Sequence, residues 1–137
     1  VLDALRDEEP VRFDAINSEL KIWLPEFDSI LFERPGQGSK VVALRARQGQ
    51  HKIAAGDLSQ GTLIALALLT LAHLPKLPSL VGLEEPARGI HPRLLRHVRD
   101  ALHRLAYPEA HGEKREPVQV IATTHSPYFL DLFKDLA

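Results

Sequence analysis

The hydrophobic positions in the first half of the chain follow two different periods. Residues 10–25 carry apolar side chains at helical spacing between two prolines, which predicts an amphipathic helix with a stripe formed by Phe13, Ile16, Leu20 and Trp23 or Leu24. Residues 28–34 and 40–47 are typical of two strands joined by the turn "RPGQGS". Residues 63–74 are apolar on nearly every side, so we expect a buried helix that begins at "DLSQG".

The second half alternates short apolar runs with helices. "PSLVGLEEP" and "PVQVIATTHSP" are apolar without alternation, the pattern of strands covered on both faces of a parallel sheet. Residues 91–106 predict a helix lying on that sheet through Leu94, Val98, Ala101 or Leu102, and Leu105. Residues 107–116 are typical of a polar surface loop, and Ser126 followed by Pro127 is typical of the start of a last helix. This order predicts a layered α/β fold with a mostly parallel sheet, plus a short antiparallel strand pair in the N-terminal half.

Composition narrows the class of protein. The chain has 137 residues, 45% of them hydrophobic, enough for one domain with a real core. Its formal net charge of −1 gives no overall electrostatic attraction to nucleic acid or to a membrane surface. The absence of Cys excludes a disulfide framework and a thiolate metal site, and the seven histidines show no zinc-type spacing, so no structural metal is predicted.

The longest apolar run, residues 63–72, is too short to span a membrane. Because the chain contains no Met, we expect Val1 to be an internal position of a longer protein.

Two adjacent carboxylates, Glu84 and Glu85, follow the first of the predicted parallel strands. Like charges side by side repel each other, and burying either without a partner costs free energy, so a structural Arg or Lys or a metal ion is expected beside them. Thr124 and His125 end the next strand. Since ligands bind at the carboxyl ends of parallel strands, these side chains are expected to line one crevice.

A second candidate site lies upstream, at the start of the predicted buried helix. In "LSQGT", Ser59 can cap the helix and Gly61 lets a ligand approach the backbone. Free N–H groups and the positive end of the helix dipole favour an anion there. An anion site, an acidic pair able to hold a divalent cation and a strand-end His together indicate a nucleotide phosphate with Mg²⁺.

Three motifs in this order resemble those of ABC-type ATPases, and more narrowly of the soluble branch with recombination, chromosome-maintenance and OLD-like ATPases. "LSQGT" resembles the ABC signature, "LVGLEEPARGIHP" resembles the Walker B strand with its D-loop, and "VIATTHSP" resembles the switch-histidine strand. The resemblance covers roughly residues 10–137 and rests on the ordered trio.

The resemblance implies a role for each matching residue. Glu84 would hold Mg²⁺ through water, Glu85 would be the general base, and His125 would contact the γ-phosphate. The nucleotide of the partner subunit would be contacted by Ser59, Gln60 and Gly61, and the D-loop at the dimer seam would be formed by Gly89, Ile90, His91 and Pro92. It further implies ATP and Mg²⁺ as cofactors, an ATP-dependent homodimer, a cytoplasmic location without a membrane partner, and nucleic acid or an associated effector protein as a further partner.

The sequence departs from the family at two points. The first acidic Walker B position, usually Asp, is Glu84, whose longer side chain can still reach a magnesium-bound water. No P-loop of the form G-x-x-x-x-G-K-[ST] exists, since "GQGSKVVAL" has the order Gly-Ser-Lys and is typical of a hairpin turn. We therefore expect residues 1–137 to be the C-terminal part of one ABC-type ATPase domain, and this stretch alone to bind ATP weakly and not to hydrolyse it.

Plainer interpretations stay open for several of these residues. Ser59 can be an ordinary N-cap, Glu85 can pair with Arg88 or Arg93, and His125 can be a core histidine bonded to Thr124. One helix face is either solvated or in contact with nucleic acid, and it carries Arg93, Arg96, Arg99, Arg104, His97 and His103. As a whole, the chain is either an ATP-hydrolysing domain in DNA maintenance or prokaryotic defence, or a non-catalytic interaction module that keeps the ATPase fold.

Overall fold

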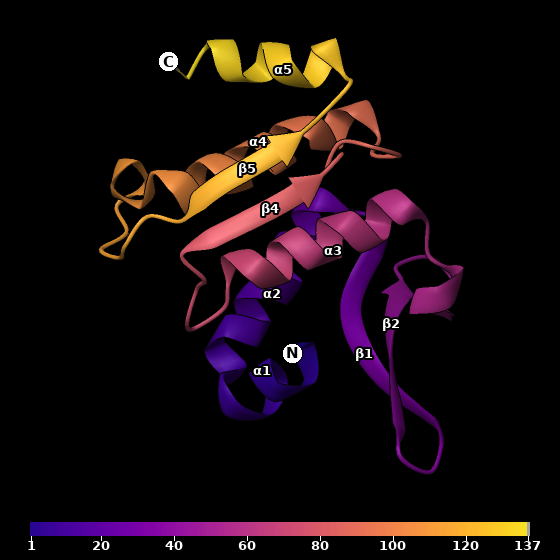
Figure 1. The fold of residues 1–137 in the computed structure, drawn as a ribbon. Coiled ribbons are helices and arrows are strands. Elements are labelled where there is room, and N and C mark those ends of the chain that lie inside the picture. Colours follow the sequence, from indigo (N-terminus) through magenta and orange to yellow (C-terminus); the bar gives the residue numbers. More distant parts are fainter. Residues whose placement is uncertain (137) are drawn as a thin grey trace. The chain divides into compact units, whose positions relative to one another are not determined.

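The computed structural model describes residues 1–136, which divide into two compact units, one that ends at His73 and one that begins at Leu74 (Figure 1). The assignment of the whole chain to part of a single ATPase domain stays a prediction.

The first unit combines helices with an antiparallel sheet. Its elements are α1 (Leu2–Glu8), α2 (Pro10–Trp23), β1 (Phe27–Gly36), β2 (Ser39–Ala46), β3 (Lys52–Ala54), a 3₁₀ turn η1 (Ala55–Asp57) and α3 (Gln60–Ala72). The predicted antiparallel pair is confirmed as β1 and β2, and β3 adds a short third strand beside β2 that the sequence analysis missed. Helix α1 was also missed.

The stretch "GQGSK" forms the tight end of the β1–β2 hairpin. Gly36 pairs with Ser39 across the turn, and Gly38 adopts the left-handed region at φ 83°, which costs a glycine little. The prediction of a hairpin turn here, in place of a P-loop, is confirmed.

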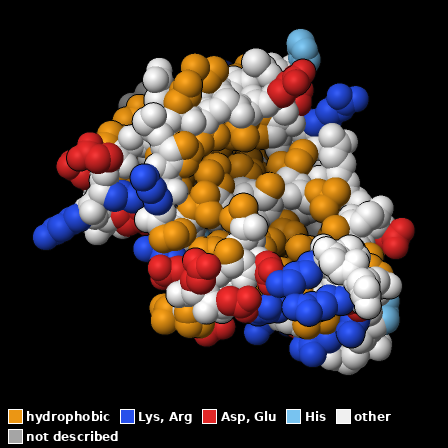
Figure 2. Space-filling model, turned by 60° about the horizontal axis from the view of Figure 1, so that its bottom comes forward, with side chains coloured by type: hydrophobic (Ala, Val, Ile, Leu, Met, Phe, Trp, Pro, Cys, Tyr) orange, Lys and Arg blue, Asp and Glu red, His pale blue; other side chains and the backbone are white. Residues whose placement is uncertain are grey.

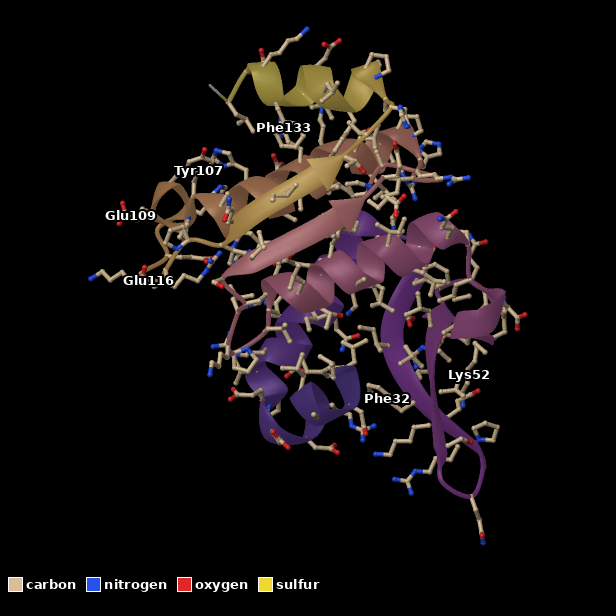
Figure 3. The ribbon with its side chains drawn as sticks, viewed as in Figure 1. Phe32, Lys52, Tyr107, Glu109, Glu116 and Phe133 are labelled. Atoms are coloured by element: carbon tan, nitrogen blue, oxygen red, sulfur yellow. The ribbon has the colours of Figure 1, made fainter. Side chains whose placement is uncertain are left out.

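Apolar side chains of the two longer helices and the sheet form the core of the first unit. The predicted stripe of α2 is buried at Phe13, Ile16, Leu20 and Trp23. On β1, Phe32 lies with its ring centre 5.8 Å from that of Phe13, and the Arg6 guanidinium lies 4.4 Å from the Phe32 ring centre (Figure 3). Helix α3 is buried at six of its residues, whereas Leu63 and Ala67 are exposed, so the prediction of a helix buried on nearly every side is confirmed only in part. Its C-cap His73 lies with Nε2 3.0 Å from Glu19 Oε1.

The second unit contains a two-stranded parallel sheet and its helices. Its elements are β4 (Leu80–Glu84), α4 (Pro92–Ala106), a 3₁₀ turn η2 (Pro108–His111), β5 (Gln119–Thr123) and α5 (Pro127–Lys134). The predicted alternation of helices and parallel strands is confirmed, and β4 and β5 lie side by side in Figure 1. Helix α4 buries the predicted stripe together with Leu95.

The expectation that both parallel strands are covered on two faces is wrong for the described residues. Val81 is buried, whereas the side chains of Leu80 and Ile121 are 51% and 55% exposed. Side chains alternate between the two faces of a strand, so packing on one face protects only every second residue. Because the apolar runs of these strands show no alternation with polar residues, the sequence pattern did not distinguish the two faces.

A charged cluster fastens the polar loop after α4 to the end of that helix. Glu113 Oε2 accepts a hydrogen bond of 2.7 Å from Arg115 Nε, and Glu113 Oε1 bonds Arg104. Arg115 Nη2 also donates to the Arg104 carbonyl at 2.7 Å. Burial raises the pKa of the Glu113 carboxyl, but the hydrogen bonds from Arg115 and Arg104 outweigh it, so its pKa lies below the ordinary 4.5.

The depressed pKa of Glu113 predicts a pH-dependent contribution to folding. A carboxyl whose pKa is lowered in the folded state stabilises it above the unfolded pKa, and this contribution is lost as pH falls through the folded pKa. We expect the difference in unfolding free energy between the natural protein and Glu113→Gln to be constant above pH 4.5 and to shrink below it. Urea unfolding of both proteins at several pH values measures this. A difference that grows toward low pH would contradict the assignment.

Candidate functional site

The two parallel strands bring their polar ends together. Glu84 is the register partner of Thr123, and the Glu85 N–H donates to the Thr123 carbonyl at 3.0 Å, so pairing continues one residue past β4. Across this edge, His125 Nε2 lies 3.7 Å from Glu85 Oε1. The expectation that these strand ends meet is confirmed.

Glu85 is unusual in its backbone and in its carboxylate. Its φ of 49° lies in the left-handed region, which costs free energy for a residue with a side chain and is found most often in turns and at functional sites. Its Oε1 is buried without a hydrogen-bond partner among the described residues. A carboxylate oxygen shielded from water in this way gains from a water, a cation or a donor beside it.

The residues at this edge suit a hydrated divalent cation. The Glu84 side chain is exposed and that of Glu85 is 22% exposed, so this end of the sheet carries two carboxylates. Carboxylate oxygen is the ligand type that Mg²⁺ takes from proteins, usually while keeping several waters. Glu84 and Glu85 therefore fit the group that the sequence implied.

His125 is not a core residue. Its side chain is fully exposed, which contradicts the interpretation as a buried histidine bonded to Thr124. Thr124 Oγ1 instead accepts a hydrogen bond of 3.0 Å from the Ser126 N–H, and Ser126 Oγ caps α5 by accepting from the Phe129 N–H at 3.2 Å. These bonds fix the backbone on the C-terminal side of His125 and leave its ring free to meet a ligand.

Thr123 is a residue of this edge that sequence reasoning did not assign. Its carbonyl and its Oγ1 both face the Glu85 N–H, at 3.0 Å and 3.4 Å. Thr123 thus helps to hold Glu85 in its left-handed conformation. The only signal for it in the sequence is a polar residue just before the end of an apolar run.

The segment after Glu85 is a compact turn that leads into α4. The Arg88 N–H donates to the Glu85 carbonyl at 2.9 Å, Gly89 has φ 70°, and Ile90 is buried. His91 caps α4 through Nδ1, which accepts from the Arg93 N–H at 3.3 Å, and Pro92 is the first helical residue. These contacts give Gly89–Pro92 a structural role, and the D-loop assignment stays a prediction.

The signature-like residues belong to the first unit. Ser59 caps α3, with Oγ accepting from the Thr62 N–H at 3.1 Å and lying 2.8 Å from Thr62 Oγ1. Gln60 is exposed and Gly61 is buried. The plain interpretation of Ser59 as an N-cap is confirmed, and an anion site at this helix end stays a prediction.

The basic face of α4 is held in contacts within the protein. Arg99 donates to Asp100 at 2.8 Å and to the Leu132 carbonyl at 3.3 Å, and Arg104 pairs with Glu113. These contacts reduce the positive charge that Arg99 and Arg104 offer to a nucleic acid.

Lys and Arg side chains gather more visibly over the β1–β2 hairpin, at the lower right of Figure 2. Basic residues of β2 and β3 form ion pairs: Lys40 with Asp3, Arg45 with Asp28 at 2.7 Å, and Lys52 with Glu33 at 3.4 Å. The hairpin is therefore less basic than its composition indicates.

Comparison with known proteins concerns the family and the fold of the chain. No curated protein matches the chain. A solved structure described as "Structural biochemistry of ATP-driven dimerization and DNA stimulated activation of SMC ATPases" is similar with a TM-score of 0.60 and 12% sequence identity, covering 96% of this chain and 78% of the other. At this identity the likeness concerns the fold. Among the described residues, no helix has the length and apolarity needed to cross a membrane.

Residues 3–131 match the family described as "AAA domain, putative AbiEii toxin, Type IV TA system". This match covers most of the chain and contains the signature-like segment, the strand-end carboxylates and His125. The chain belongs to this AAA domain family.

Proposed function

We propose that this chain supplies the hydrolytic and dimer-forming part of an ABC-type ATPase. The observation that carries the proposal is the strand-end cluster, where Glu85 Oε1 is buried without a hydrogen bond and lies 3.7 Å from the exposed His125 ring. A protein that only binds a partner needs neither a shielded carboxylate nor a free imidazole at this edge. The family match supports the same chemistry.

In this proposal each strand-end residue has one task. Glu85 accepts the proton of the water that attacks the γ-phosphate, and His125 donates a hydrogen bond to that phosphate as its charge develops. Glu84 holds Mg²⁺ through water, and this ion neutralises phosphate charge when bound. Residues 1–137 contain no G-x-x-x-x-G-K-[ST] loop, so we propose full nucleotide affinity for the full-length protein only.

The proposal also includes the partner. Ser59, Gln60 and Gly61 contact the nucleotide of a second copy, so ATP joins two subunits into a homodimer. The similarity to an SMC ATPase fold described with ATP-driven dimerization supports this. The family description, which names a putative toxin of a type IV system, favours prokaryotic defence over DNA maintenance as the setting, with nucleic acid or an effector protein as a further partner.

His125→Ala in the full-length protein tests the strand-end cluster. Loss of one donor to a developing phosphate charge is expected to lower the ATP turnover rate by about 10². The fold should be unaffected, because the His125 side chain is fully exposed. ATP turnover and nucleotide affinity of the variant and the natural protein provide the measurement.

The matched control is His51→Ala, which removes another exposed histidine, just before β3 in the first unit. Its turnover should equal that of the natural protein. If His125→Ala also keeps normal turnover, the strand-end cluster is not the hydrolytic site.

A further inference from the structure

Two histidines outside the strand-end cluster face each other directly. His103 lies in the last turn of α4 and His111 in the 3₁₀ turn η2, and their ring nitrogens Nδ1 and Nε2 are 2.9 Å apart. The ring centres are 5.2 Å apart, and the His103 ring also packs at 4.9 Å from the ring of Tyr107. At this distance the two rings share one proton, so one nitrogen directs its lone pair at the other.

Several contacts hold this pair in place. Tyr107 and Glu109 lie together at the end of α4, and Glu109 belongs to the same short turn as His111 (Figure 3). Gly112 ends that turn in the left-handed region at φ 73°, and the ion pairs of Glu113 with Arg104 and Arg115 bind the following loop to α4. These contacts fix the backbone of the turn that brings the two rings together.

The geometry is close to that of two ligands on one metal ion. A tetrahedral Zn²⁺ ion with Zn–N bonds of about 2.0–2.1 Å separates two ligand nitrogens by about 3.3 Å. The observed 2.9 Å needs only a small rotation of the exposed His111 ring. If the hydrogen between the rings moves to the other nitrogen of its own ring, both facing nitrogens carry lone pairs, and the rotation lets them point at one metal ion.

We propose that His103 and His111 form a two-histidine site for a divalent transition-metal ion such as Zn²⁺, with water in the remaining positions. Imidazole nitrogen is a preferred ligand for zinc, copper and nickel and a poor one for Mg²⁺. The described residues contain no group of three or more ligating side chains, so this is an open site with exchangeable ligands. The site joins α4 to η2 and is independent of the proposed ATP chemistry.

Calorimetric titration with Zn²⁺ alone tests the proposal on the full-length protein. A His125→Gln background keeps Glu85 and His125 from forming a second site. We expect one equivalent of Zn²⁺ to bind, and either His103→Gln or His111→Gln to weaken binding by at least about tenfold, the lower end of what loss of an outer-shell partner costs. His51→Gln, which removes an exposed histidine elsewhere, should leave Zn²⁺ affinity unchanged.

Cu²⁺ electron paramagnetic resonance adds a readout of ligand number. The natural pair should give coupling to two nitrogens, and each Gln variant should give coupling to one. Because His111 is exposed, His111→Gln is expected to fold even if His103→Gln does not. Unchanged Zn²⁺ affinity in His111→Gln, or a single-nitrogen spectrum in the natural protein, would show that the two rings only share a proton.

Discussion

Glu85→Gln in the full-length protein is expected to lower the ATP turnover rate by about 10²–10⁴ while leaving ATP binding nearly unchanged. The amide keeps the size of the side chain and one acceptor oxygen but cannot accept a proton from water. The backbone of Glu85 is fixed by the Thr123 carbonyl at 3.0 Å, so the amide should occupy the same place. Single-turnover hydrolysis and equilibrium ATP binding separate the two effects.

Two other glutamates make this test specific. Glu84→Gln should raise the Mg²⁺ concentration needed for turnover, because Glu84 is assigned to the ion through water. The turnover rate at saturating Mg²⁺ should change less. Glu116→Gln changes an exposed glutamate on the loop before β5 and should have no effect (Figure 3). If Glu85→Gln hydrolyses ATP within a few-fold of the natural rate while Glu84→Gln does not, Glu84 is the base.

Glu85→Gln has a second use, because a protein that binds ATP without hydrolysing it should accumulate in its ATP-bound form. If ATP joins two subunits, the variant becomes a stable dimer whose mass can be measured.

The sequence predicted those parts of the fold in which local pattern and packing agree. The stripe of α4 and the cap residues Ser59 and Ser126 were found because helical spacing and hydroxyl caps are local signals. The meeting of Glu85 and His125 was found because the ends of adjacent parallel strands must coincide. Each of these depends on a regularity of one element or one sheet.

Other features depend on contacts that no short window of sequence encodes. β3 has only three residues and exists through its pairing with β2. The left-handed backbone of Glu85 is set by its bond to Thr123, and glutamate has no preference for that region. His103 and His111 are eight positions apart, and only the 3₁₀ turn after α4 brings their rings together.

Ser59 is where the plain and the functional interpretations need to be separated, since the structure confirms that it caps α3. In a Glu85→Gln background, Ser59→Arg is expected to abolish ATP-driven dimerisation. The Arg side chain would fill the anion site at the helix end and meet the opposing subunit. ATP binding within each subunit should persist, because Ser59 is assigned to the nucleotide of the partner only.

Loss of the Ser59 cap alone costs about 1 kcal/mol of stability. A second substitution is therefore needed to show that lost dimerisation does not come from the lost cap. Ser59→Asp keeps a good N-cap but places a negative charge where the partner's phosphate is expected, and it should also prevent the dimer. Ser18→Arg, at an exposed serine of α2, is the matched control and should dimerise normally. Light scattering against ATP concentration gives the mass of each protein. If Ser59→Asp and Ser59→Arg both dimerise as readily as the control, Ser59 is a helix cap only, and the resemblance of "LSQGT" to an ABC signature carries no function.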